Sequence, residues 1–165
     1  MMPANDATSA QIQAADPGLS TWVSANAGSG KTRVLTDRVA RLLLRETPPQ
    51  RILCLTYTKA AASHMQIQLF ERLGKWAMLP DAELRSNLNE LGESSKALSS
   101  EDLRRARTLF ARALETPGGL KIQTIHSFCA ALLRRFPVEA GVSPQFQEMD
   151  ERSGKDCRPT FLKHW

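Results

Sequence analysis

The stretch that decides the fold reads ANAGSGKT, from Ala25 to Thr32. A short run that favours β-structure, TWVS at residues 21–24, leads into it, and apolar residues at helical spacing follow it. Between a strand and a helix, such a loop lets backbone N–H groups surround a phosphate, and the N-terminus of the helix adds its dipole. The stretch therefore predicts a P-loop, which binds nucleotide phosphates, rather than a chance run of glycines.

The residue types in the loop match the chemistry of a bound triphosphate. The two glycines, Gly28 and Gly30, allow a close approach of the backbone that side chains would block. Lys31 reaches the β- and γ-phosphates, and Thr32 offers its hydroxyl to Mg²⁺. We expect ATP with Mg²⁺ as the ligand, although Ala25 stands where many P-loops have glycine. The residues expected to hold it are Ala25, Asn26, Ala27, Gly28, Ser29, Gly30, Lys31 and Thr32.

Strands and helices are expected to alternate outward from this loop. The strands are expected at residues 21–24, 52–57 and 120–125, and the helices at about 30–45, 59–73 and 127–136. The run at 52–57 is apolar on both faces, which suits a buried parallel strand. This order predicts an α/β fold with a parallel sheet, flanking helices and right-handed crossovers.

A helical insertion is expected at about residues 75–116. Pro80-Asp81 opens it, and Ser99 followed by Asp102 resembles a capping box before a helix at 103–115. The polar patch at 92–100 is expected to be a loop, and Pro117-Gly118-Gly119 to end the insertion. The apolar stripe of the second helix is expected to comprise Leu103, Ala106, Leu109, Phe110, Ala113 and Leu114.

Composition narrows the class of protein without naming a partner. Of the 165 residues, 42% are hydrophobic and 24% charged, as is ordinary for a globular domain. The net charge of +5 is spread along the chain, so charge alone does not indicate nucleic acid. The polar first residues lack the apolar core of a secretory signal, which makes a cytoplasmic location the expectation. Three cysteines form no CxxC pair, and Cys54 and Cys129 are expected to be core residues.

Two further stretches follow expected strands, where open α/β sheets bind ligands. The first is Thr56-Tyr57-Thr58-Lys59-Ala60-Ala61-Ala62, in which an exposed tyrosine would stack a base and the lysine would hold a phosphate. The alternative is a core Tyr57 with Thr58 capping a helix. The second is Thr124-Ile125-His126-Ser127-Phe128, in which His126 and Ser127 would contact a phosphate. The alternative there is a helix capped by Ser127.

Together the three stretches resemble UvrD/Rep-type superfamily 1 DNA helicases over residues 11–151. The P-loop is similar to that family's motif I, residues 56–62 with Met65 to motif Ia, and residues 124–128 to the Thr-x-His-Ser motif. The likeness is strongest to the AddA subunit of AddAB helicase–nucleases, in residues 23–32, 110–123 and 136–141.

The resemblance implies roles that the residues alone do not. It implies a P-loop NTPase (RecA-like) motor domain at 21–151, preceded by a polar lead-in at 1–20. Gln11 occupies the place of the family's adenine-reading glutamine, with Gln13 as a competitor. The residues that would contact single-stranded DNA are Thr56, Tyr57, Thr58, Lys59, His126 and Ser127. The family unwinds broken DNA ends for recombinational repair, which implies DNA as partner and an AddB-like subunit for the whole protein.

The sequence also departs from the pattern of this family in several places. The acidic box that binds Mg²⁺ and positions water is absent, since Asp150-Glu151 follows a run that is not apolar. The second motor domain and its arginines are also absent, so the chain is expected to be inactive alone. Residues 152–165 show no apolar periodicity, and we interpret them as the product of a shifted reading frame or of a decayed gene. The alternatives are a free-standing P-loop nucleotide kinase and an inert truncated product.

Overall fold

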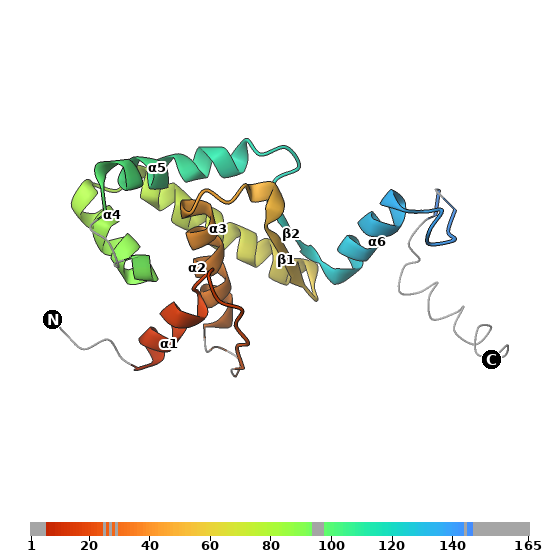
Figure 1. The fold of residues 1–165 in the computed structure, drawn as a ribbon, viewed down its shortest axis with the longest axis horizontal. Coiled ribbons are helices and arrows are strands. Elements are labelled where there is room, and N and C mark those ends of the chain that lie inside the picture. The colour runs from red at the N-terminus through yellow and green to blue at the C-terminus, as the bar shows by residue number, and fades with distance from the viewer. Residues whose placement is uncertain are drawn as a thin grey trace. The chain divides into compact units, whose positions relative to one another are not determined.

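The computed structural model describes residues 6–24, 26, 28, 30–93, 98–143, 145 and 146 (Figure 1). The chain forms two compact units, Met1–Gln123 and Thr124–Trp165. The elements of the larger unit are α1 (Asp6–Ala14), α2 (Lys31–Leu44), η1 (Pro49–Arg51), β1 (Leu53–Thr56), α3 (Lys59–Met78), α4 (Asp81–Leu88), η2 (Asn89–Glu93), α5 (Ser100–Leu114) and β2 (Lys121–Thr124, whose last residue opens the second unit). The second unit contains α6 (Ile125–Arg135).

The helix after the glycine loop, α2, forms as its apolar spacing predicts. It buries Val34, Val39, Ala40 and Leu43 on one side and ends before the prolines at 48–49. The next helix, α3, runs five residues beyond the expected end at 73. Trp76 continues the buried stripe of Met65, Leu69 and Leu73, and the stop comes only at Pro80. Packing of that indole therefore extends α3.

The residues of the expected helical insertion form α4, η2 and α5, which contribute Leu84, Leu88, Leu91, Leu103, Ala106, Leu109 and Ala113 to the core. Ser99 and Asp102 form the predicted capping box at the start of α5. Figure 1 shows α5 lying along α3, where the rings of Phe70 and Phe110 meet edge to face with centroids 6.0 Å apart. Leu114 is exposed, contrary to the expected stripe. The largest fully buried side chains of this core are Trp76, Leu69, Leu73, Leu84, Leu88, Leu103 and Leu109.

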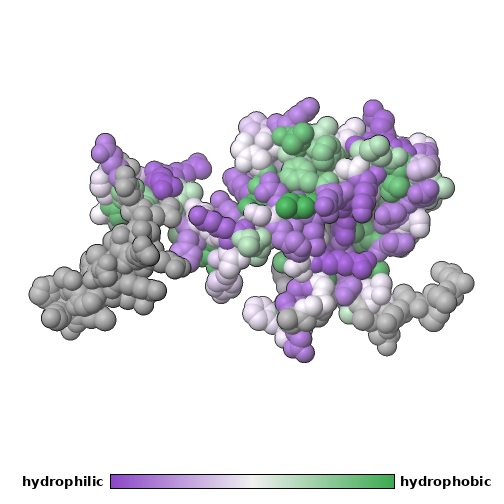
Figure 2. Space-filling view, turned by 180° about the vertical axis from the view of Figure 1, so that it is seen from behind, coloured by the Kyte–Doolittle hydropathy of each residue, from purple (hydrophilic) through white to green (hydrophobic). Residues whose placement is uncertain are grey.

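The sheet is smaller than expected. Within the described residues it consists of two strands, β1 and β2, which pair in parallel, so the fold is α/β with flanking helices. The strand expected at residues 21–24 is wrong: these residues are irregular, and Trp22 is 92% exposed. A strand persists only in a hydrogen-bonded ladder, and this segment has no paired neighbour in the described part. Figure 2 shows hydrophobic clusters interrupting the otherwise mostly polar surface of the larger unit.

Within the polar lead-in, residues 6–14 form the helix α1, which was not among the elements expected from the sequence. Ala15, directly after it, is buried, and Ile12 is half-buried. No described helix is long and apolar enough to cross a membrane.

The second unit begins with α6, two residues earlier than expected. Thr124 is its N-cap, because its Oγ1 accepts a hydrogen bond from the backbone N–H of Ser127 at 3.1 Å. The alternative with Ser127 as the cap is therefore wrong. Cys129 is exposed, so its prediction as a core residue is also wrong, whereas Cys54 packs against the core and burial raises the pKa of its thiol.

Candidate nucleotide site

The glycine loop enters α2 through a left-handed backbone. Gly30 is the N-cap of the helix with φ of 86°, and Gly28 has φ of 79°. A side chain at either position would be strained, so both glycines are required by the backbone path. The path brings the first turn of α2, with Lys31 and Thr32, directly to the loop. Ala25, Ala27 and Ser29 lie outside the described residues.

Lys31 spans the loop that it terminates. Its Nζ donates a hydrogen bond to the carbonyl oxygen of Asn26 at 2.6 Å, and the side chain is exposed. The ammonium group thus lies over the loop and reaches solvent. A phosphate oxygen offered there would be a charged acceptor, which an ammonium group binds more strongly than a neutral carbonyl.

Thr32 lies half-buried in the first turn of α2. Its backbone carbonyl accepts a hydrogen bond from Oγ1 of Thr36 at 3.1 Å. A threonine hydroxyl is a hard oxygen ligand of the kind that Mg²⁺ prefers. Among the described residues of the loop, the ammonium group of Lys31 and the hydroxyl of Thr32 at a helix N-terminus therefore fit a triphosphate with its metal ion.

The two candidate adenine readers lie in different surroundings. A Cβ built on Gly30 would lie 3.1 Å from Nε2 of Gln11, so the amide of Gln11 rests against the loop. Gln13 is exposed and lines a separate hollow with residues 19–24. Of the two, Gln11 is the one that α1 brings to the glycine loop.

The stretch after β1 presents its tyrosine to solvent. Tyr57 is 84% exposed, so the alternative of a core tyrosine is wrong. Thr58 does cap a helix, since its Oγ1 accepts from the N–H of Ala61 at 3.1 Å, and Oγ1 of Thr56 donates to the carbonyl of Thr58. Lys59 is exposed at the first position of α3. This end of β1 therefore offers an aromatic face beside a cation, while the threonines also hold the turn.

The stretch after β2 belongs to the second unit. His126 is exposed in the first turn of α6, and the hydroxyl of Ser127 lies 2.9 Å from that of Thr124. Both sites follow a strand directly, as the sequence predicted. A common surface formed by Tyr57 and His126 stays a prediction.

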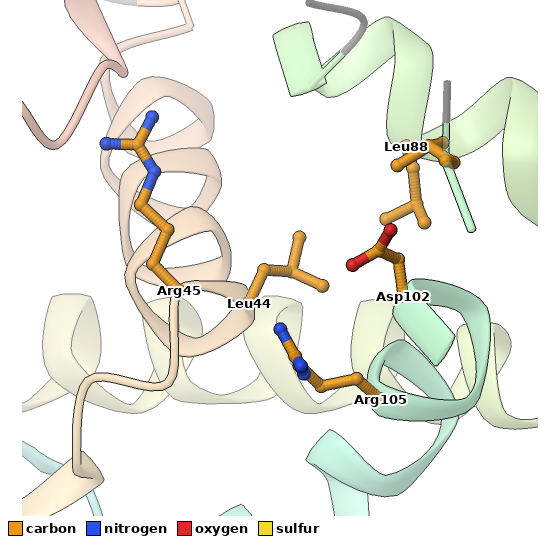
Figure 3. Close-up of a pocket in the computed structure, with 6 residues that line it drawn as sticks. Leu44, Arg45, Leu88, Asp102 and Arg105 are labelled. Carbon is orange, nitrogen blue, oxygen red and sulfur yellow. The ribbon is translucent and has the colours of Figure 1, made fainter. Parts of the chain in front are cut away.

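A cavity of about 60 Å³ between α2, α4 and α5 is a different feature. Figure 3 shows Leu44 pointing toward Asp102 and Arg105, whereas Arg45 turns away from them. Ligand pockets commonly measure about 300–1,000 Å³, so this cavity is too small for a nucleotide. It reflects the packing of the insertion onto α2.

With this geometry established, comparison with known proteins decides the family. Residues 5–164 match the model of the UvrD/REP helicase N-terminal domain. The chain belongs to this family. Members that resemble it are named as the AddA subunit of an ATP-dependent helicase/nuclease: that of Carboxydothermus hydrogenoformans is 34% identical over 89% of this chain and 10% of its own length. Those of Bacillus pumilus and Clostridium novyi are 33% and 34% identical over 84% and 87% of this chain, and each match covers 10% of the relative.

The chain corresponds to only a small part of each of these relatives. The chain spans about a tenth of the length of the curated relatives that it matches. The family match includes residues 152–164, which lie outside the described residues, as does Asp150-Glu151. The interpretations of the acidic pair and of the tail therefore stay predictions.

One group of residues in this family member had not been singled out from the sequence. Arg38, Arg41 and Arg45 project from α2 toward α1 and the turn after it, and Asp16 lies 3.9 Å from Arg41 and 3.3 Å from Arg45. The pKa of Asp16 is lowered, first by the hydrogen bond from the backbone N–H of Gly18 and then by these two guanidinium groups. The spacing of arginines at i, i+3 and i+7 was the available signal.

Proposed function

We propose that this chain is the ATP-binding and single-stranded-DNA-contacting part of an ATP-dependent DNA helicase that acts in the repair of double-strand breaks. The observation that carries the proposal is Lys31, which lies across a glycine loop at the start of α2 with its ammonium group exposed. The similarity to relatives named as helicase/nuclease subunits supports the finer part of the proposal.

In this proposal the loop is part of a P-loop motor domain of the RecA-like type. Ala25, Asn26, Ala27, Gly28, Ser29 and Gly30 surround the phosphates, Lys31 and Thr32 hold the β- and γ-phosphates and Mg²⁺, and Gln11 reads the adenine. Hydrolysis of bound ATP supplies the energy for movement along DNA in such motors. The whole protein would act in the cytoplasm on DNA ends with an AddB-like subunit.

DNA would be contacted at the ends of the two strands. Tyr57 offers an exposed ring for a base, while Lys59 and His126 offer cationic or polar contacts to phosphates, with Thr56, Thr58 and Ser127 beside them. Stacking on an aromatic side chain contributes about 1–3 kcal/mol per base. The same binding should weaken as salt rises, since phosphate contacts release counterions.

The test is a titration of fluorescent single-stranded DNA followed by anisotropy. Tyr57→Ala should weaken binding by about 1–3 kcal/mol, which is roughly tenfold to a hundredfold. Tyr57→Phe is the matched control and should keep most of the affinity, because it retains the ring. Equal affinity of the alanine variant, with an unchanged circular dichroism spectrum, would contradict stacking at Tyr57. No DNA binding at all would favour a small P-loop nucleotide kinase instead.

A second expectation is that the isolated chain neither hydrolyses ATP at a useful rate nor unwinds DNA. Phosphoryl transfer needs a positioned water and cations on the transition state in addition to a phosphate cradle. The measurement is phosphate release by the purified chain with and without DNA. Turnover near the ~1 per second typical of slower phosphoryl-transfer enzymes, abolished by Lys31→Ala, would contradict this.

A further inference from the structure

Two arginines of α2 bind the backbone at the end of α1. Nη1 of Arg41 donates to the carbonyl of Ile12 at 2.9 Å, and Nη1 of Arg38 donates to the carbonyl of Asp16 at 2.6 Å. Arg38 also reaches the carbonyls of Ala14 and Leu19. The last carbonyls of a helix have no partner within it, so these guanidinium groups complete the carboxyl end of α1 and the turn that follows.

The contact is specific because Arg41 is buried. Its side chain is only 5% exposed, and the nearest carboxylate, Asp16, lies 3.9 Å from Nη2. A buried guanidinium group that loses its acceptors is strongly disfavoured. Undocking of α1 would remove the carbonyl of Ile12 from Arg41, so α1 is held in one position on α2.

The insertion meets the same point. Gly92 in η2 has φ of 92°, and a Cβ built on it would lie 2.4 Å from Cγ2 of Ile12 and 3.5 Å from Nη1 of Arg41. Only glycine allows this approach. Three elements, α1, α2 and η2, therefore meet around Ile12, one residue after Gln11.

We propose that Arg38 and Arg41 are positioning residues for base recognition: they fix α1 so that the amide of Gln11 lies against Gly30 of the phosphate loop. The inference rests on the proposed function, in which Gln11 reads the adenine. The described hydrogen bonds of Arg38 and Arg41 go to backbone carbonyls between residues 12 and 19, at the end of α1 and in the turn after it. Their loss should therefore reduce selection of the base without affecting the hold on the phosphates.

The experiment compares three ligands by calorimetry on the full chain: Mg²⁺ with ATP, with GTP and with inorganic tripolyphosphate. For Arg38→Met and Arg41→Met we expect the affinity for ATP to fall about tenfold, toward that for GTP, as for loss of one or two hydrogen bonds. The affinity for tripolyphosphate should stay within about twofold, on the scale of a small surface effect. Gln11→Ala should show the same pattern, and Gln11→Ala combined with Arg38→Met should lose no more than either alone.

Two further variants separate positioning from general destabilisation. Arg104→Met is the matched control, because Arg104 is exposed on α5 and pairs with Glu101 away from α1, and it should leave all three affinities unchanged. Gly92→Ala should reproduce the loss of preference for ATP through displacement of Ile12. If Arg41→Met does not fold by circular dichroism, Arg38→Met and Gly92→Ala decide.

Retention of the preference for ATP in Arg38→Met and Gly92→Ala, while Gln11→Ala loses it, would overturn the inference and leave the proposed function standing. An equal fall for ATP, GTP and tripolyphosphate would also overturn it, since the arginines would then be purely structural. Failure of the unmodified chain to bind tripolyphosphate would contradict the proposed function and the inference with it.

Discussion

The helices α5 and α6 have the same apolar periodicity but differ in how much of their apolar face is buried. Both are amphipathic, and both begin at a hydroxyl-bearing cap, Ser99 and Thr124. On α5 the apolar stripe is covered: Leu109 is 2% exposed and belongs to the same hydrophobic core as the buried side chains of α3. On α6 only Ala130 is buried, and Leu132 is 47% exposed. Apolar periodicity thus predicts a helix and the face that it would bury, but not whether another element covers that face.

The difference has a physical basis in the amount of apolar surface near each helix. The insertion returns along α3, so α5 finds a ready partner such as Phe70 for its Phe110. The described part of the second unit offers α6 only a short turn and the side chain of Phe146. The guanidinium carbon of Arg134 lies 5.4 Å from the centroid of that ring. Burial of apolar area, at about 25 cal/mol per Å², favours the first arrangement far more than the second.

The largest expected effect is a core truncation in α5. Leu109→Ala should lower the free energy of unfolding of the larger unit by about 2–5 kcal/mol, because it leaves a cavity among packed side chains. Urea denaturation followed by circular dichroism measures it. A loss below about 1 kcal/mol, the usual size of a surface change, would break the comparison, since α5 would then not be part of the core.

Removal of the helix caps at Ser99 and Thr124 should lower stability less than Leu109→Ala does, and the two substitutions should affect different parts of the chain. Ser99→Ala removes the hydroxyl, which accepts from the backbone N–H of Asp102 at 3.2 Å and donates to its carboxylate at 2.7 Å, and should cost about 0.5–2 kcal/mol of the stability of the larger unit. Thr124→Ala should act locally, because an 11-residue helix with one buried side chain is marginal on its own. Hydrogen exchange should show faster exchange in α6 and at the end of β2, where Thr124 lies, and not in α5. Equal global destabilisation by both variants would mean that α6 is packed in solution.

The stability that the Ser99 cap contributes should depend on pH. The hydrogen bonds from the side chain and backbone of Ser99 lower the pKa of Asp102 below its ordinary value of 3.8. A lowered carboxyl pKa contributes stability that is present above 3.8 and is lost as the pH falls through the lowered value. The difference between Ser99→Ala and the unmodified chain should therefore shrink in strong acid. A difference that is independent of pH would show that Asp102 does not take part.

The smallest effect is expected for Leu132→Ala in α6. Because Leu132 is nearly half exposed, its truncation should change the free energy of unfolding by no more than about 0.5 kcal/mol. This substitution is the counterpart of Leu109→Ala, with the same chemical change on the other helix. A loss of about 2 kcal/mol or more, the core value, would show that the apolar face of α6 is covered in solution.

Sequence alone predicted the local features whose causes are local. The start of α2 at Lys31, the capping box at Ser99 and the strand at 53–56 follow from glycine, hydroxyl and apolar patterns within a few residues. What it missed depends on distant partners: Trp22, which has no ladder among the described strands, the exposure of Cys129 and Leu114, and the helix α1 held by Arg38 and Arg41. The choice between Gln11 and Gln13 also depends on a distant contact, because only the packing of α1 shows which of them lies beside the glycine loop.

The central claim is that the glycine loop binds the triphosphate of ATP through Lys31. Calorimetric titration of the chain with ATP and Mg²⁺ tests it most directly, with Lys31→Ala as the variant. A charge-assisted contact to a phosphate contributes about 1.5–3 kcal/mol, so the variant should bind roughly tenfold to a hundredfold more weakly. Arg104→Met, which removes an exposed cation far along the chain, should bind as the unmodified protein does. Equal affinity of Lys31→Ala and the unmodified chain would contradict the account.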